Sequence, residues 1–432
     1  MSDQLQRLGD FFVAQAITAK GLIINLILIG GLMSTASAQE EPQFVPVLTP
    51  DAARIFAEMP DTSVEIPEVY ELLTIAISVA NIEDFLGDLI PEGESADGFM
   101  IDKSTPYYED VEAQFGDHRD HPLIAKIRET FPPMIETFNI PGLLTYRNQS
   151  LRYRFDEEGL VSNDLYIPIS EAPLTEFPEL EALVTSLPFD IDDSETLSQI
   201  EDFAEKTNFR QFYKEHQDYY DARSELATDL CNVGAARDWL AAQFPAAYNN
   251  HTIVLSPLVG GTHNFFPTST PDESVTQALM FVSIFKGDAE TAADVSLEDQ
   301  VAYCRKSFTE IDHGYVNPAT DLYAEEVDEA MPDITPWNSD ETNQGVYSTP
   351  YDTFNEYMTH GAYSLFLSET LSTEELENAI SYQENFMVND RGFVKYPEFN
   401  RELLRLYQER EEGQTVTNLY PAVLEWVAAQ TQ

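Results

Sequence analysis

The run ALMFVSIF, residues 278–285, is almost entirely apolar and ends at Lys286-Gly287-Asp288. A second run, TIVLSPL, residues 252–258, is rich in β-branched residues and is followed by Gly260-Gly261. Short apolar runs bounded by turn residues are typical of strands that are buried on both faces. These two stretches therefore predict the central strands of a small sheet.

Helical signals surround those strands. Ser296, with Asp299 three residues later, predicts the start of a helix over residues 297–313, and Gly314 and Pro318 predict its end. Thr349-Pro350 places a hydroxyl before a proline and predicts the start of another helix. Further helices are expected over residues 66–86, 106–130 (interrupted at 118–122), 179–244, 373–386, 397–411 and 420–430, and short strands over 151–155 and 165–169. The predicted fold class is α+β, rich in helices, with a small central sheet.

The composition excludes several classes of protein. The 432 residues include 76 Asp and Glu against 23 Lys and Arg, which gives a formal net charge of −53. A surface this negative repels phosphate backbones and anionic lipid headgroups, so we expect neither nucleic-acid binding nor membrane-surface binding. Hydrophobic residues make up 43% of the chain and aromatic residues 12%. That content predicts a folded acidic protein rather than a disordered one.

The first 38 residues have the features of a signal peptide. Lys20 precedes the uncharged run GLIINLILIGGLM, and the small-residue pattern Ala36-Ser37-Ala38 follows it. The run is shorter than the ~20 apolar residues that span a bilayer. We therefore expect cleavage before Gln39 and a mature protein in the periplasm or outside the cell, with an uncleaved N-terminal anchor as the alternative.

The mature chain is expected to have a mainly helical region over residues 39–245 and a second region over 246–432. It contains two cysteines, Cys231 and Cys304. In an exported protein two lone cysteines often pair, so a disulfide is one expectation, and two separately buried thiols are the other.

The segment Thr309-Glu310-Ile311-Asp312-His313 is close to the H-E-x-x-H helix of zinc peptidases. In that motif the two histidines lie one turn apart on one helix face, and the glutamate acts as general base. Glu310 and His313 match the second and fifth positions, whereas Thr309 stands where the first histidine belongs. Because threonine is a poor zinc ligand, the motif is degenerate. A helix end, with His313 as a cap and Glu310 in solvent, is the competing interpretation.

Four further residues are candidates for such a site. Glu356 and His360 are four residues apart in the helix that begins at Pro350, so both face the same way, and Glu356 is the natural carboxylate ligand. His263 follows the first central strand, in a position from which loops often contribute to sites. Either His360 or His263 would supply the ligand that Thr309 cannot. Tyr315 is a candidate for stabilising an oxyanion, although a tyrosine that only packs is the alternative.

An ordered set of short motifs resembles a family of secreted bacterial proteins known as a domain of unknown function with a zincin-like, gluzincin-type metallopeptidase signature. These motifs are His121-Pro122, residues 208–213 (NFRQFY), residues 255–258 (LSPL), residues 310–318 and Phe354-Asn355-Glu356. Typical members of that family carry a complete H-E-x-x-H. The resemblance implies a zincin-like fold, a zinc cofactor and a peptide or protein substrate, and Thr309 is the departure from the pattern.

Three hypotheses about function follow. The first is an exported zincin-like metallohydrolase, most plausibly a peptidase, with Glu310 as base and zinc held by His313, Glu356 and a replacement histidine. The second is an inactive member of the same fold that binds a peptide, glycan or protein. The third is a scaffold protein in which the motif is incidental, and this hypothesis predicts that Glu310, His313 and Glu356 do not converge.

Overall fold

A computed structural model describes residues 60–82, 100–136, 140–163, 190–246, 248–269, 276–339, 344 and 347–430. The expected signal peptide and the strand expected over residues 165–169 lie outside this part of the chain. Within it the fold is helix-rich α+β, with fourteen α-helices and a mixed four-stranded sheet, which confirms the predicted fold class. The chain divides into two compact units, residues up to 227 together with 249–286, and residues 228–248 together with 287–432. The division expected between residues 245 and 246 stays a prediction.

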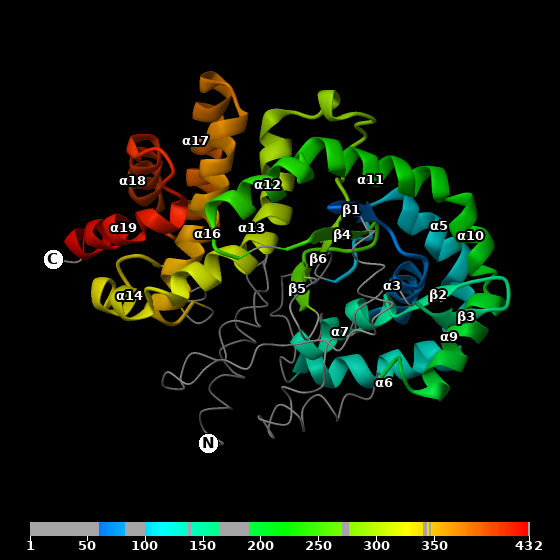
Figure 1. Cartoon of the computed structure of the whole chain (residues 1–432). Helices are drawn as coiled ribbons and strands as arrows, with labels where there is room; N and C mark the ends of the chain where they lie inside the picture. Colours follow the sequence, from blue (N-terminus) through cyan, green and yellow to red (C-terminus); the bar gives the residue numbers. More distant parts are fainter. Residues whose placement is uncertain are drawn as a thin grey trace, which may run out of the picture. The chain divides into compact units, whose positions relative to one another are not determined.

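The first unit is built on the four-stranded sheet, in the order β1-β4-β6-β5. Strands β1, β4 and β6 are parallel, and β5 is antiparallel to β6 at one edge (Figure 1). Every residue of β4 and all but the first of β6 are buried, which confirms the two predicted central strands. The strands are β1 (Thr62–Glu65), β4 (Asn250–Ser256), β5 (Asn264–Ser269), β6 (Thr276–Ser283) and a separate hairpin of β2 (Tyr153–Phe155) and β3 (Leu160–Ser162).

Helices accompany the sheet in this unit. Helix α3 packs on β6 through the rings of Tyr70 and Phe281, whose centroids are 5.4 Å apart. The N-cap hydroxyl of Thr105 accepts a hydrogen bond from Tyr108 N, and Pro106 follows at the first helical position, which explains where α5 begins. The helices are α3 (Glu68–Ala80), α5 (Pro106–Phe115), α6 (Pro122–Glu136), α7 (Ile140–Ser150), α9 (Ser194–Lys206), α10 (Phe209–Glu215) and α11 (Gln217–Cys231), the last of which continues into the second unit.

One carboxyl group lies in the core of the first unit. Glu71 of α3 is fully buried, and its Oε1 accepts a 2.8 Å hydrogen bond from the hydroxyl of Tyr107. The Tyr107 hydroxyl is in turn 2.6 Å from the hydroxyl of Tyr220. Burial raises the pKa of Glu71 to about 7, although hydrogen bonds from Ser256 and Tyr107 act in the opposite direction. This carboxyl therefore titrates near neutral pH.

The second unit is entirely helical in the described residues. Its helices are α12 (Val233–Gln243), α13 (Leu297–Asp321), α14 (Ala324–Ala330), α16 (Pro350–Thr370), α17 (Thr373–Asn389), α18 (Tyr396–Glu409) and α19 (Val416–Gln430). Helices α13 and α16 pack against each other. Gly361 allows α16 to approach α18 closely, since a Cβ there would lie 2.5 Å from Leu403 Cδ2.

The predicted end of α13 is wrong. The helix begins as expected, with the Ser296 hydroxyl accepting from Asp299 N at 3.1 Å, but it continues through Gly314 and Pro318 to Asp321. Pro318 has no N–H, so it leaves the carbonyl of Gly314 without its usual helical donor. The hydroxyl of Tyr248 lies 3.4 Å from that carbonyl oxygen and supplies a donor. A tertiary contact that the local sequence does not show thus allows the helix to pass through its proline.

A disulfide joins Cys231, at the end of α11, to Cys304 in α13, which confirms the paired alternative. Both residues belong to the second unit, so the bond fastens two sequence-distant parts of that unit together. Structural disulfides persist in oxidising compartments, and this one indicates an extracytoplasmic location. None of the helices in the described residues is long and apolar enough to cross a membrane.

Candidate functional site

Helix α13 places the degenerate motif inside the second unit. Thr309, Glu310 and His313 are all buried, with 1%, 1% and 6% of their surface exposed. The competing interpretation, in which His313 caps a helix end and Glu310 is in solvent, is therefore wrong, because α13 extends for two more turns. The physical reason is the continuation of the helix past Gly314.

Thr309 does not replace the missing histidine. Its hydroxyl donates a 2.9 Å hydrogen bond to the carbonyl oxygen of Arg305, one turn earlier in the same helix. This is the usual way for a buried threonine to satisfy its hydroxyl within a helix. The first position of the motif thus serves the helix backbone.

Helix α16 brings Glu356 and His360 to the same place. The hydroxyl of Thr349 and the carboxylate of Asp352 form a capping box that sets the start of this helix. Glu356 Oε2 lies 4.0 Å from His313 Nε2, and Glu356 Oε1 lies 3.2 Å from His360 Nε2. The two imidazoles therefore flank one buried carboxylate, and this convergence counts against an incidental motif.

A hydrogen-bond chain fixes the ring of His313. Its Nδ1 lies 3.0 Å from Asn317 Oδ1, an oxygen that also accepts from the amide of Asn355. The Asn355 amide is oriented by Thr320, whose hydroxyl donates to Asn355 Oδ1 at 2.8 Å. Nδ1 therefore carries the proton of the neutral ring, and burial keeps the pKa of His313 below its ordinary value. The lone pair is on Nε2, which has no hydrogen-bond partner and faces Glu356.

Arg391 is the residue that sequence reasoning missed. It lies just after α17, is buried, and donates from Nη2 to Glu356 Oε1 at 2.6 Å and to the hydroxyl of Tyr347. Burial alone would raise the pKa of Glu356, but the guanidinium of Arg391 and the contact with His360 outweigh it and bring that pKa to about 2. The carboxylate is therefore ionised and already paired with a cation. An isolated arginine in a loop has no local sequence pattern that would have shown this.

A third carboxyl group lies close by in α13. Asp312 is fully buried, and neither of its oxygens has a hydrogen-bond partner. Burial, together with the charges of Glu356 and Glu310, holds its pKa well above the ordinary value and favours the protonated form. Burial and neighbouring charge thus shift the pKa values of Glu356 and Asp312 in opposite directions.

The two remaining candidates have other surroundings. Tyr315 is buried, and its ring packs against those of Tyr248 and Phe244, with centroids 5.2 Å and 6.4 Å away. His263 belongs to the first unit, where its Nε2 lies 3.4 Å from the hydroxyl of Ser283. Their roles as oxyanion stabiliser and ligand stay predictions.

The donor set of this cluster is smaller than a catalytic zinc site requires. A catalytic zinc usually has three protein ligands and a water. The cluster offers the lone pair of His313 Nε2 and one oxygen of Glu356, while Thr309 and Arg391 are engaged as described. Across the described residues no group of three or more His, Cys, Asp or Glu side chains is arranged to hold a metal ion. The residues present do not fit a three-ligand zinc site.

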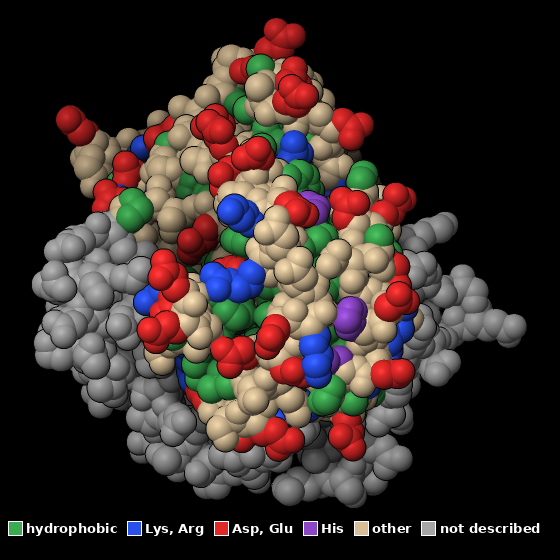
Figure 2. All heavy atoms as spheres, turned by 90° about the vertical axis from the view of Figure 1, so that its right-hand side faces the viewer, with side chains coloured by type: hydrophobic (Ala, Val, Ile, Leu, Met, Phe, Trp, Pro, Cys, Tyr) green, Lys and Arg blue, Asp and Glu red, His purple; other side chains and the backbone are tan. Residues whose placement is uncertain are grey.

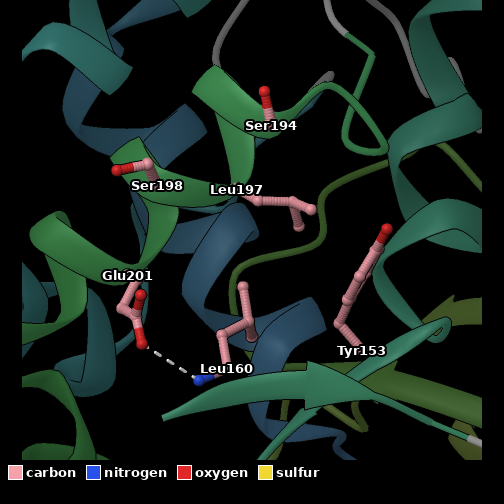
Figure 3. Close-up of a pocket in the computed structure, with 6 residues that line it drawn as sticks. All are labelled: Tyr153, Leu160, Ser194, Leu197, Ser198 and Glu201. Atoms are coloured by element: carbon pink, nitrogen blue, oxygen red, sulfur yellow. Dashed lines mark hydrogen bonds between the residues drawn. The ribbon is translucent and has the colours of Figure 1, made fainter.

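A small pocket of about 260 Å³ lies in the first unit, between the β2–β3 hairpin and α9 (Figure 3). Leu160 from the hairpin and Leu197 from the helix extend into the space between these elements. The carboxylate at its edge, Glu201, accepts a 3.2 Å hydrogen bond from the backbone N–H of Leu160. Ser194, Ser198 and Tyr153 also line the pocket.

A model of the family described as domain of unknown function (DUF4932) matches residues 63–426. The chain belongs to the DUF4932 family. The match covers both units of this DUF4932 protein, including α13 and α16. No curated protein and no solved structure matches the chain.

The surface of the DUF4932 protein carries the charge that the composition shows. On the face drawn in Figure 2, acidic side chains are spread widely, and Lys and Arg are fewer and dispersed among them. Of the large hydrophobic side chains in the described part of the chain, only Leu322 and Val394 are exposed, and they are single residues rather than a patch.

Proposed function

We propose that this DUF4932 protein is an exported, zincin-like pseudoenzyme that binds a peptide or protein without hydrolysing it. The observation that carries the proposal is the buried ion pair of Arg391 with Glu356, at 2.6 Å. Glu356 is the carboxylate that would bind zinc. The guanidinium of Arg391 already provides this carboxylate with a positively charged partner. A second cation beside it would be repelled.

The motif supports the same conclusion. Thr309 binds the backbone of its own helix, so the site lacks one ligand of the three that a catalytic zinc needs. Glu310 is left without the metal-bound water on which a general base of this kind acts. The chemistry of the remaining residues favours recognition over hydrolysis.

The site keeps a group that could recognise a ligand. His313 Nε2 is an acceptor with no hydrogen-bond partner in the folded chain, in a side chain that is 7% exposed. A buried acceptor left unsatisfied costs about 1–3 kcal/mol, which a donor from a bound peptide would recover. We place the protein in the periplasm or outside the cell, after removal of residues 1–38.

The test uses the mature protein from Gln39, purified without a metal-affinity tag. We expect no stoichiometric zinc by elemental analysis and no hydrolysis of a peptide library. We expect capture of peptides from the same library, weakened by His313→Phe and unchanged in Glu205→Gln, an exposed control in α9. Stoichiometric zinc, hydrolysis abolished by Glu310→Gln, or failure to retain any peptide would overturn the proposal.

A second candidate is the zinc metallohydrolase that the sequence predicts, and the orientation of His313 favours it. Metal-binding histidines usually donate their other ring N–H to an oxygen, as His313 Nδ1 does to Asn317. In this candidate Glu310 is the base, His313 and Glu356 are ligands, and His360 completes the set. The same zinc analysis and the Glu310→Gln comparison separate the two candidates.

A further inference from the structure

His360 lies at the centre of a second hydrogen-bond chain, which runs from α13 through α17 to α16. Arg305 Nη1 donates to Gln383 Oε1 at 3.3 Å, and Gln383 Nε2 lies 2.9 Å from His360 Nδ1. On its other side, His360 Nε2 lies 3.2 Å from Glu356 Oε1. The hydrogen-bond chain therefore runs from a buried guanidinium to His360 Nδ1, and the other ring nitrogen faces the buried carboxylate without meeting hydrogen-bond geometry.

The direction of each donor in this chain follows from its first member. A guanidinium has donors only, so the atom of Gln383 that faces Arg305 must be the carbonyl oxygen. The amide N–H₂ of Gln383 then faces His360, and Nδ1 must accept from it. A ring nitrogen that accepts a hydrogen bond carries no proton, so this imidazole is neutral and has a single ring proton. That proton is consequently on Nε2, facing Glu356.

We infer that Gln383 is a positioning residue that keeps the ring proton of His360 on Nε2, the nitrogen 3.2 Å from Glu356 Oε1, and so prevents His360 from acting as a metal ligand. The arrangement is the reverse of that at His313, where Nδ1 carries the proton and the Nε2 lone pair is available. Metal-binding imidazoles need a lone pair on the nitrogen that faces the metal, and the group bound to the other nitrogen decides this. The inference rests on the proposed function, because it explains how the site is held in a metal-free form.

The variant Gln383→Glu would reverse the direction of the chain. A carboxylate accepts hydrogen bonds and does not donate them, so it would accept a hydrogen bond from a protonated His360 Nδ1 and leave the lone pair on Nε2. Arg305 is 2% exposed and stacks 3.3 Å from the centroid of Phe386, and the described ion pairs include none for it. The new carboxylate would therefore gain a buried cationic partner. His313, His360 and Glu356 would then present two lone pairs and a carboxylate together.

The experiment compares the mature wild-type protein with Gln383→Glu and Gln383→Met. Methionine is the matched control because it has a similar volume but neither donates nor accepts as an amide does. Long-range ¹H–¹⁵N correlation spectra, assigned with a His360→Gln variant, report which ring nitrogen carries the proton. We expect the proton on Nε2 in the wild type and on Nδ1 in Gln383→Glu. The wild-type spectrum alone tests the inference even if a variant does not fold.

Zinc titration gives a second readout. Partners of this kind typically change metal affinity by about 10–100-fold, so we expect Gln383→Glu to bind zinc at least about tenfold more tightly than Gln383→Met. A proton on Nδ1 of wild-type His360, or equal zinc affinities of the two variants, would overturn the inference. Stoichiometric zinc in the wild type with the proton still on Nε2 would overturn the proposed function alone.

Discussion

The buried carboxyl of Glu71 gives a prediction about stability that is independent of the candidate site. Burial raises its pKa from 4.5 to about 7 in the folded chain. Because the folded state holds the proton more tightly than the unfolded state, the stabilising contribution is complete below about pH 4.5. It is lost as the pH rises through 7. The folded protein should therefore become less stable, through this group, from mildly acidic to alkaline pH.

The difference between the two pKa values, 7 − 4.5, corresponds to about 3.4 kcal/mol of unfolding free energy over the full range. About 2.5 kcal/mol of this is lost between pH 5 and pH 9. Glu71→Gln carries no titrating group at this position, so its stability should lack this component of the pH dependence.

Urea unfolding followed by circular dichroism at pH 5, 7 and 9 tests the prediction. The wild type should lose about 2.5 kcal/mol relative to Glu71→Gln between the extremes, whereas Glu205→Gln, which changes an exposed carboxyl in the same unit, should follow the wild type. Tyr107→Phe removes a donor to the ionised carboxylate and should steepen the loss at high pH. A Glu71→Gln curve parallel to that of the wild type would refute the reasoning.

Three further predictions concern the second unit. Reduction of the Cys231–Cys304 disulfide, or replacement of both cysteines by serine, should lower the unfolding free energy by about 4 kcal/mol, because the bond closes a loop of 73 residues. Urea unfolding with and without reductant measures this loss. Arg391→Met leaves Glu356 buried without its cationic partner and should lower the unfolding free energy by about 3–5 kcal/mol. The double variant Arg391→Met with Glu356→Gln should regain most of this free energy. Equal losses in the single and double variants would contradict a stabilising ion pair. The raised pKa of Asp312 makes the folded wild type lose stability as the pH rises, and Asp312→Asn lacks this titrating group. The stability of Asp312→Asn relative to the wild type should therefore rise from pH 5 to pH 8. A constant difference would show that Asp312 does not hold its proton in the folded chain.

Much of the fold follows from local patterns. The buried strands were predictable because a continuous apolar run of this length has few alternatives, and the starts of α13 and α16 followed from their capping residues. The end of α13 was not predictable in the same way. The carbonyl of Gly314, which Pro318 leaves without its helical donor, is satisfied by Tyr248, which lies 66 residues earlier in the chain, and no local rule includes such a contact.

The candidate site was predictable only in part for a similar reason. Glu356 and His360 could be placed together because a spacing of four residues puts both on one face of α16. Their association with His313 was expected only from the resemblance to the zincin-like pattern. The residues that decide the state of the site, Arg391 and Gln383, come from α17 and the loop after it. Their importance depends on the packing of α17 against α13 and α16, which the sequence pattern does not encode.

The path of the chain between the two units has a consequence for how the protein is made. The chain leaves the first unit after residue 227, returns for residues 249–286, and then remains in the second unit. A ribosome must therefore have released residue 286 before the first unit possesses β4 and β6, and Cys231 must wait for Cys304 before it can find its partner. The two units therefore cannot fold one after the other, from the N-terminus to the C-terminus, as the chain is synthesised. A fragment that stops at residue 245 would lack the two central strands and should not be used as an isolated domain.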